Sequence, residues 1–357
     1  MKDRRLVLGA ALALIGLPLV MVPIEAIGWY SANADNGSFV SSGLKREYLL
    51  YVPKSYDRSR PTPLILSLHG AGLWGAAQRD MSLFNRLADR EGLIVVYPSG
   101  LGGQGIRVWH TEEGPGPMRD VRFISELIDT IEAHYNIDAS RIYANGLSNG
   151  GGMSFVLSCT LSHRIAAVGL VASAQLLPWK WCTDHRAVPM IDFHGTADPE
   201  VPIRGGASWV LPGDTRFPDQ LTWAANWARR NRCAPNPVDS AVAPDVTRRT
   251  YTNCAEDAAV VLYIVHGGGH TWPGGGRMPE WFVGPTNRSI DATSLMWAFY
   301  REHPLRDTQT AVLHQGATDP RSRSRSRAGS APPSGKRSDR ARRAPVRART
   351  AAPAPGP

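Results

Sequence analysis

The sequence predicts an α/β fold in which a mostly parallel sheet carries helices on both faces. Short, continuously apolar runs stop at glycine or proline, as in residues 63–70 (PLILSLHG) and 92–100 (GLIVVYPSG), and this pattern is typical of strands buried on both faces. Segments with helical spacing alternate with these runs, as in residues 81–92 (MSLFNRLADREG). Because strands that alternate with helices form parallel sheets, we expect one α/β domain over residues 35–306.

Each expected element follows from the local pattern of apolar residues and from the residues that end it. The expected strands are residues 46–53, 63–70, 92–100, 141–148, 165–174, 188–195 and 259–270. The expected helices are residues 81–92, 120–135, 223–230 and 291–302. Asp120 is the expected N-cap of the second helix, because an aspartate there can accept a backbone N–H.

The N-terminal segment predicts export from the cell. Residues 1–34 join a basic start to an uncharged, mostly apolar run from Leu6 to Ile24, and an A-x-A-like cleavage site follows at Ala34. We therefore expect a cleaved signal peptide and a secreted protein. The apolar run is nearly long enough to span a bilayer, so an uncleaved membrane anchor is the alternative.

The positive charge of the chain lies near its C-terminus. The formal net charge is +9, but the part from Arg321 onward holds eleven of the 40 Lys and Arg and one of the 31 Asp and Glu. Residues 307–357 are too poor in apolar residues to order themselves, and we expect a disordered basic tail. This tail either contacts an anionic surface or has no role. The rest of the chain is close to neutral, so no nucleic-acid partner is required; the oligomeric state stays open.

Four cysteines follow the expected export signal and predict disulfide bonds. None has the C-x-x-C spacing of a structural zinc site. We expect sequence neighbours to pair, Cys159 with Cys182 and Cys233 with Cys254, although the other two pairings remain open. Each short closed loop would add about 3 kcal/mol of stability by the chain-entropy estimate.

The stretch NGLSNGGGM, residues 145–153, surrounds one serine with four glycines. Gly146, Ser148 and Gly150 fit the pattern G-x-S-x-G, in which a strand turns sharply into a helix and exposes the serine hydroxyl. Glycine allows the positive φ and the close backbone approach that such a turn needs. Ser148 also falls at the carboxyl end of a central strand, where open α/β sheets place their sites. Ser148 is thus the candidate nucleophile, and the alternative is a capping serine at a glycine-rich helix start.

A serine nucleophile needs a base, and the base needs a third group that holds its tautomer. Asp198 follows the strand at 188–195, and His270 follows the next long strand after three glycines. The order Ser, Asp, His is the chain order expected after a G-x-S-x-G turn. We therefore expect Ser148, Asp198 and His270 to act together, without a metal or an organic cofactor.

Three rivals for these roles are less suitable. Asp192 lies inside an apolar strand and is expected to be a hydrogen-bonded core carboxylate. His194 and His266 lie at strand ends, before the loops that could bring a side chain back to Ser148. His270 instead follows three glycines that allow its loop to fold over the serine.

Ester chemistry at Ser148 would also need donors for a developing oxyanion. One is the backbone N–H of Asn149, the residue after the serine. The second is expected from the loop that follows residues 63–70, where either Ala71 or Gly72 is the candidate. The alternative is an ordinary turn between a strand and a loop.

Two tryptophans are candidate substrate-binding residues. Trp272 is two residues from His270, and Trp109 lies on the loop after the strand at 92–100. Flat aromatic rings on both sides of the serine would form a cleft for a short hydroxyalkanoate or an aromatic acid. Alternatively, Trp272 only packs the loop that holds the histidine.

Four motifs in this order resemble a known family. They are HGAG (residues 69–72), GLSNGG (146–151), HGTAD (194–198) and GGGHTWPGG (267–275). Together they resemble the secreted α/β-hydrolases known as polyhydroxybutyrate (PHB) depolymerase-like esterases, a group that overlaps the feruloyl esterases. The resemblance covers residues 46–306. It implies a single catalytic domain of the α/β-hydrolase fold, the triad Ser148, Asp198 and His270, and an oxyanion hole of Asn149 and Ala71.

The sequence thus predicts a secreted serine esterase that forms an acyl-enzyme on PHB-type or related short-chain esters. A feruloyl esterase acting on plant polysaccharide esters is an alternative. A non-catalytic surface-binding protein with this fold is another, but all three expected triad residues are present. Depolymerases that attack solid granules generally add a substrate-binding domain, whereas residues 307–357 are an arginine-rich segment, so the resemblance gives no basis for expecting activity on crystalline polymer.

Overall fold

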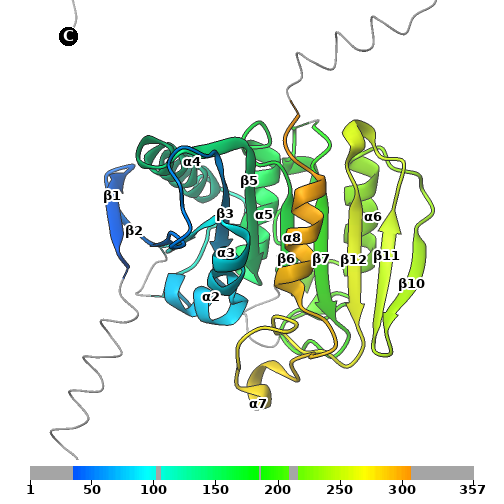
Figure 1. Ribbon diagram of the computed structural model, residues 1–357. Coiled ribbons are helices and arrows are strands. Elements are labelled where there is room, and N and C mark those ends of the chain that lie inside the picture. Colours follow the sequence, from blue (N-terminus) through cyan, green and yellow to red (C-terminus); the bar gives the residue numbers. More distant parts are fainter. Residues whose placement is uncertain (1–34, 102–105, 185, 209–215, 307–357) are drawn as a thin grey trace, which may run out of the picture. The chain divides into compact units, whose positions relative to one another are not determined.

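A ten-stranded sheet with helices on both faces dominates the part of the chain that the structure describes (Figure 1). The computed structural model describes residues 35–101, 106–184, 186–208 and 216–306. The expected signal peptide at 1–34 and the expected basic tail at 307–357 lie outside the described residues. Every helix within the described ranges is too short or too polar to cross a membrane.

The sheet is parallel in its centre and antiparallel at both edges. Its strands, in spatial order, are β1 (Gly37–Ser41), β2 (Leu44–Tyr51), β4 (Ile94–Pro98), β3 (Thr62–Leu68), β5 (Ile137–Leu147), β6 (Val168–Val171), β7 (Met190–Gly195), β12 (Val260–Val265), β11 (Val246–Tyr251) and β10 (Val238–Ala243). All neighbours from β4 to β12 run parallel, so these strands end at one edge of the sheet. The ribbons β1–β2 and β10–β11 pair antiparallel outside them.

Two apolar layers, one on each face, hold the sheet between helices. One layer contains side chains of α4 (Gly116–His134), α5 (Asn149–Thr160) and α6 (Gln220–Arg230). The other contains side chains of α2 (Gly75–Ser82), α3 (Phe84–Glu91) and α8 (Ala292–Glu302). Successive side chains of a strand point to opposite faces, and β3 therefore places Leu64 and Leu66 in the first layer and Ile65 in the second. This is why β3, β4, β6 and β7 are buried at every position and are mainly apolar.

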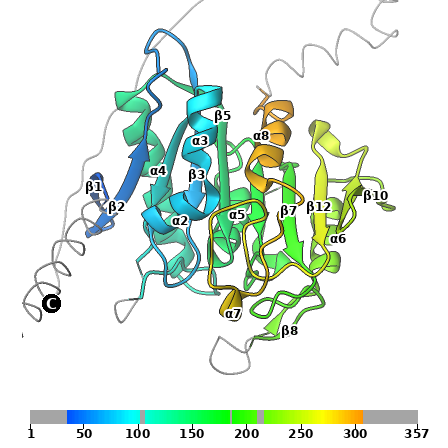
Figure 2. The same cartoon turned by 60° about the horizontal axis from the view of Figure 1, so that its bottom comes forward.

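The remaining elements are short, and those that follow β7 and β12 lie near the carboxyl ends of the parallel strands. The pair β8 (Gly206–Ala207) and β9 (Arg216–Phe217) follows β7, and α7 (Glu280–Val283) follows β12. Figures 1 and 2 show α7 beyond the sheet edge at which β7 ends. Two three-residue helical turns, Trp179–Trp181 and Ala255–Asp257, complete the described elements.

The expected N-cap at Asp120 is wrong. Helix α4 begins at Gly116 after Pro115, and Asp120 lies inside the helix with 1% of its surface exposed. Its carboxylate is 2.9 Å from the buried guanidinium of Arg46, and it also accepts a hydrogen bond from the His110 backbone N–H. An aspartate that reads as a cap in the sequence is instead a buried ion-pair partner.

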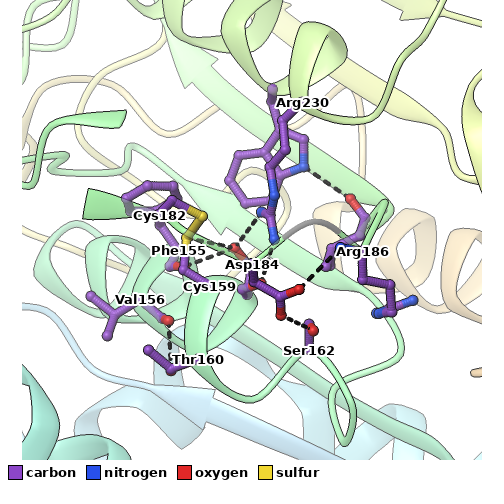
Figure 3. The surroundings of a disulfide bond; sticks show 12 residues. Phe155, Val156, Cys159, Thr160, Ser162, Cys182, Asp184, Arg186 and Arg230 are labelled. Atoms are coloured by element: carbon purple, nitrogen blue, oxygen red, sulfur yellow. Dashed lines mark hydrogen bonds between the residues drawn. A yellow bond between two sulfur atoms is a disulfide. The ribbon is translucent and has the colours of Figure 1, made fainter. Parts of the chain in front are cut away.

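The structure contains the two disulfides between sequence neighbours, Cys159–Cys182 and Cys233–Cys254. Figure 3 shows the first of them beside Arg230 of α6, whose Nη1 donates to Ser158 Oγ at 2.9 Å. Cys159 is in the last turn of α5, so this disulfide ties the segment after β6 to the helix that begins beside Ser148.

Candidate active site

Ser148 occupies a sharp turn between β5 and α5. Its φ is 53° and its ψ is −119°, a conformation that costs a non-glycine residue about 1–3 kcal/mol. The flanking glycines make the turn possible: a Cβ on Gly146 would lie 2.3 Å from the carbonyl carbon of Gly150, and one on Gly150 would lie 2.3 Å from the Leu68 carbonyl oxygen. Close contact between β3, β5 and α5 thus explains why this serine is surrounded by glycine.

Asp198 and His270 come from adjacent parallel strands and meet at the edge where these strands end. Asp198 is on the loop after β7 and His270 is on the loop after β12. His270 Nδ1 is 2.8 Å from Asp198 Oδ2, and Asp198 Oδ1 accepts the backbone N–H groups of Glu200 and Val201, each at 2.9 Å. A carboxylate can only accept, so Nδ1 carries the proton and the Nε2 lone pair of neutral His270 is free to act as a base.

The ionisation of this buried pair is set by opposing effects. Burial alone lowers the pKa of His270, but the carboxylates of Asp198 and Glu200 outweigh it and raise the His270 pKa above its ordinary value. Burial raises the pKa of Asp198, yet the nearby His270, together with His194 and the hydrogen bond from the Val201 N–H, outweighs it, so the Asp198 pKa lies below its usual range. The pair therefore favours an ionised Asp198 and stabilises an imidazolium if His270 takes a proton.

One cavity of about 620 Å³ brings Ser148 and His270 together. Its wall also contains Asn149, Ala71 and Trp109. The rest of the wall is mainly apolar and comes from the end of β5, from β9 and α7, and from loops after β3, β4, β6, β7 and β12. Its residues are Gly70, Gly72, Leu73, Ile106, Val108, Leu147, Ala174, Leu176, Val201, Phe217, Met278, Pro279, Phe282 and Val283. Its polar members besides the expected site residues are Glu112, Glu200 and Ser208.

The two candidates for the second oxyanion donor differ in their hydrogen bonds. The N–H of Gly72 donates to the Arg107 carbonyl oxygen at 2.8 Å and is already used. The Ala71 N–H has no backbone acceptor in the described part of the chain. Ala71 and Asn149 both line the cavity beside Ser148, which favours the pair implied by the family resemblance.

Trp109 and Trp272 do not form the expected pair of walls. Trp109 lines the cavity, but Trp272 is fully buried on the second apolar face and is absent from the cavity wall. Trp272 donates from Nε1 to Thr293 Oγ1 at 2.9 Å and packs edge-on against Phe84. Trp272 therefore packs the histidine loop, and α7 with the residues beside it supplies the wall that this tryptophan was expected to form.

The two rival histidines have other partners, and the expectation that Asp192 is a hydrogen-bonded core carboxylate is wrong, because neither of its carboxylate oxygens has a hydrogen-bond partner among the described residues. His194 Nε2 lies 2.8 Å from the Val201 carbonyl oxygen, and His266 Nε2 lies 2.9 Å from Thr247 Oγ1. Asp192 is fully buried in β7, where burial raises its pKa to about 7. None of the three lines the cavity among the described residues.

Two polar side chains with no role predicted from the sequence, those of His69 and Asn149, organise the loops around Ser148. His69 is fully buried; the backbone N–H of Gly100 donates to its Nε2 at 2.9 Å, and its Nδ1 lies 2.7 Å from the Gly70 carbonyl oxygen. Burial lowers the pKa of His69 to about 4, so it stays neutral. The Asn149 side chain accepts the Trp109 N–H at 2.7 Å and donates to the Trp109 carbonyl at 3.0 Å. The loop after β4 is thus clamped to the residue after the serine.

Known proteins with similar sequences are esterases. Residues 46–193 match the family described as esterase PHB depolymerase. Feruloyl esterase B of Piromyces equi is 29% identical over 249 residues, which cover 67% of this chain and 45% of that protein. A bifunctional acetylxylan esterase/xylanase of Neocallimastix patriciarum is 26% identical over 231 residues, covering 64% of this chain and 31% of that protein. Feruloyl esterase C of Emericella nidulans is 27% identical over 232 residues, which cover 63% of this chain and 76% of that protein.

The chain spans less than half the length of the first two of these relatives. The match to the family nevertheless includes the strand and turn that carry Ser148, and it lies within a mostly parallel sheet covered by helices on both faces, the α/β-hydrolase architecture. By these matches and this fold, the chain is similar to carboxylic ester hydrolases of the PHB depolymerase and feruloyl esterase group.

Proposed function

We propose that this protein hydrolyses short carboxylic esters through a triad of Ser148, His270 and Asp198. The observation that carries the proposal is the shared cavity, in which the strained turn presents Ser148 beside a histidine whose Nδ1 is 2.8 Å from a carboxylate. Acyl transfer needs a nucleophile, a base and a group that orients the base, and these residues supply all three.

The reaction would proceed in two halves. Ser148 Oγ attacks the ester carbonyl carbon while His270 Nε2 takes the serine proton, and the N–H groups of Asn149 and Ala71 donate to the oxyanion. When the intermediate collapses, His270 returns that proton to the departing alcohol and leaves an acyl-enzyme. Water then attacks the acyl carbon with His270 again acting as base, and the acid departs from Ser148.

The cavity supports a small acyl group of either kind that the sequence suggested. Its volume of about 620 Å³ is in the ordinary range for small-molecule sites. A hydroxybutyrate-type group is the first candidate, because the family match is to esterases described as PHB depolymerases. A hydroxycinnamoyl group is the second, because Trp109, Phe217 and Phe282 give the wall aromatic character and relatives are named feruloyl esterases.

We also propose that the protein works outside the cytoplasm. Two disulfides support an oxidising compartment, and the described cysteines are all paired. The expected signal peptide agrees with this location.

Replacing the nucleophile tests the proposed function. Ser148→Ala should fold normally and lose nearly all hydrolysis of p-nitrophenyl butyrate, keeping at most the ~10³–10⁴-fold acceleration over water that binding and oxyanion donors can supply. A serine-directed phosphonate should label the wild-type protein and not this variant. Near-normal turnover by folded Ser148→Ala would refute the triad, and a panel of feruloyl and hydroxybutyrate esters on the wild type would rank the two acyl groups.

A further inference from the structure

A second carboxylate lies on the substrate side of His270. Glu200 Oε2 is 3.5 Å from His270 Nε2, and the Glu200 side chain is 17% exposed in the cavity wall. The separate carboxylate of Asp198 already binds the other ring nitrogen, Nδ1. The proposed triad leaves Glu200 without a role.

The position of Glu200 is fixed by the turn that holds Asp198. Its backbone N–H donates to Asp198 Oδ1 at 2.9 Å, so the carboxylate that orients His270 also anchors the backbone of Glu200. A separation of 3.5 Å from Nε2 is longer than a good hydrogen bond, and the Glu200 oxygens therefore keep acceptor capacity for another donor.

In the proposed mechanism, Nε2 is the atom that protonates the departing alcohol. A group 3.5 Å from Nε2 consequently lies beside the alcohol portion of the ester. The alcohol of a polyol ester carries hydroxyl groups close to the ester oxygen, and these can donate hydrogen bonds. The leaving fragment of a hydroxybutyrate dimer instead carries a carboxylate and no nearby hydroxyl donor.

The charges around the cavity all have the same sign. Glu112 is the second acidic residue in the wall, and its Oε2 accepts the Thr111 N–H at 2.9 Å. No Lys or Arg belongs to the wall among the described residues. An ionised carboxylate in a mainly apolar cavity accepts hydrogen bonds and repels other anions, and water screens this repulsion only in part.

We propose that Glu200 is a specificity-determining residue for the leaving alcohol: it accepts a hydrogen bond from a hydroxyl group of an uncharged polyol and disfavours alcohols that carry a carboxylate. This inference rests on the proposed hydrolysis at Ser148. It assigns selectivity for the alcohol to Glu200 and leaves selectivity for the acyl group to the apolar wall.

Three butyrate esters that differ only in the alcohol test this role. They are 2-hydroxyethyl butyrate, propyl butyrate and carboxymethyl butyrate, and all three give the same butyryl-enzyme. Differences in kcat/KM therefore report the alcohol side, and intrinsic differences in reactivity cancel when the ratios are compared between proteins. Ester cleavage is followed by acid release at constant pH.

Glu200→Gln should reduce the preference for the hydroxyethyl over the propyl ester about tenfold, and it should relax the discrimination against the carboxymethyl ester by a similar factor. Glu200→Asp, which keeps the charge on a shorter side chain, should retain most of the discrimination against the carboxymethyl ester. Glu112→Gln is the matched control: it removes the other acid of the wall and should leave the hydroxyethyl-to-propyl ratio near that of the wild type.

Labelling with a serine-directed phosphonate counts the folded, competent sites in each sample. If Glu200→Gln is labelled normally and keeps both wild-type ratios, the role of Glu200 is refuted while hydrolysis at Ser148 stands. An equal change of the hydroxyethyl-to-propyl ratio in Glu112→Gln would also overturn it, because the effect would then be one of general charge. If Glu200→Gln is not labelled, the Glu200→Asp ratios decide, and loss of anion discrimination there contradicts the proposal.

Discussion

At the scale of the residue, the environment of His270 predicts how hydrolysis depends on pH. His270 is buried, and burial lowers its pKa, but Asp198 and then Glu200 raise it more. The neighbouring His194 adds little positive charge, because burial lowers the pKa of His194. A general base must be neutral, so kcat/KM should fall as the pH drops through the His270 pKa, at a midpoint above the ordinary imidazole value of about 6.5.

Removing one carboxylate should move this midpoint. Glu200→Gln deletes one of the charges that raise the pKa of His270, so His270 should stay neutral to lower pH and the acid limb of kcat/KM should shift downward. The profile is measured between pH 5 and pH 9 with p-nitrophenyl butyrate. The alcohol portion of this ester has no hydroxyl group that could donate a hydrogen bond to Glu200. Glu200→Asp serves as the charged control. A midpoint unchanged by Glu200→Gln would mean that Glu200 and His270 are not electrostatically coupled.

A candidate site residue could be predicted from the sequence only where a motif or its position after a buried strand marked it. Ser148 carries a sequence motif, and Asp198 and His270 follow strands whose ends must meet at one sheet edge, so chain order was sufficient. Trp272 was assigned to the cavity because it is close to His270 in sequence, but proximity along a loop does not fix where a side chain points. Glu200 gave no signal, since a single acid in a loop ordinarily reads as a solvent-exposed residue.

At the scale of the element, the buried strands were predictable and the exposed hairpin was not. Strands β3, β4 and β7 are buried at every position because both faces of the sheet are covered, and their mainly apolar runs mark them in the sequence. Strand β10 reads VDSAVA and is mostly exposed, so its pairing with β11 is not encoded in an apolar run. Tertiary contacts rather than local patterning form this edge.

Strand β7 also carries a carboxylate that should make stability depend on pH. Asp192 is fully buried and aligned with Leu170 of β6 and Leu262 of β12, and burial raises its pKa to about 7. In the unfolded chain this carboxyl ionises near pH 4. Between about pH 4 and pH 7 the unfolded state therefore binds fewer protons than the native state, and the free energy of unfolding falls as the pH rises.

Asp192→Asn should remove this dependence. The variant should be more stable than the wild type at pH 8 by up to about 4 kcal/mol, and the gain should shrink towards pH 4. Asp138→Asn provides a control of opposite sign, because burial at Asp138 is outweighed by hydrogen bonds from Ser140 and Arg141, which lower its pKa. Urea unfolding at several pH values measures both variants. The prediction would be contradicted if the free energies of unfolding of the wild type and of Asp192→Asn rose together from pH 5 to pH 8, with a constant difference between them.

At the scale of the whole molecule, the excess positive charge and the residues proposed for catalysis lie in different parts of the sequence. Every residue assigned to the triad, the oxyanion donors and the cavity wall lies between residues 70 and 283. The excess of basic residues instead begins at Arg321, outside the described residues. The net charge of +9 therefore carries no information about the substrate of the cavity.

A shortened chain that ends at Arg306 should lose the excess positive charge and keep the ester hydrolysis. It keeps all described elements, including α8, whose Trp297 and Tyr300 pack in the second apolar layer. We expect unchanged kcat/KM for p-nitrophenyl butyrate, within about twofold, because none of the residues proposed to act on the ester is removed. Retention on a cation-exchange column and on vesicles rich in anionic lipid should fall, because the eleven Lys and Arg from Arg321 onward are lost. If the shortened protein remains folded by circular dichroism but no longer hydrolyses the soluble ester, residues 307–357 contribute to the active site, and the domain boundary proposed at Arg306 is wrong.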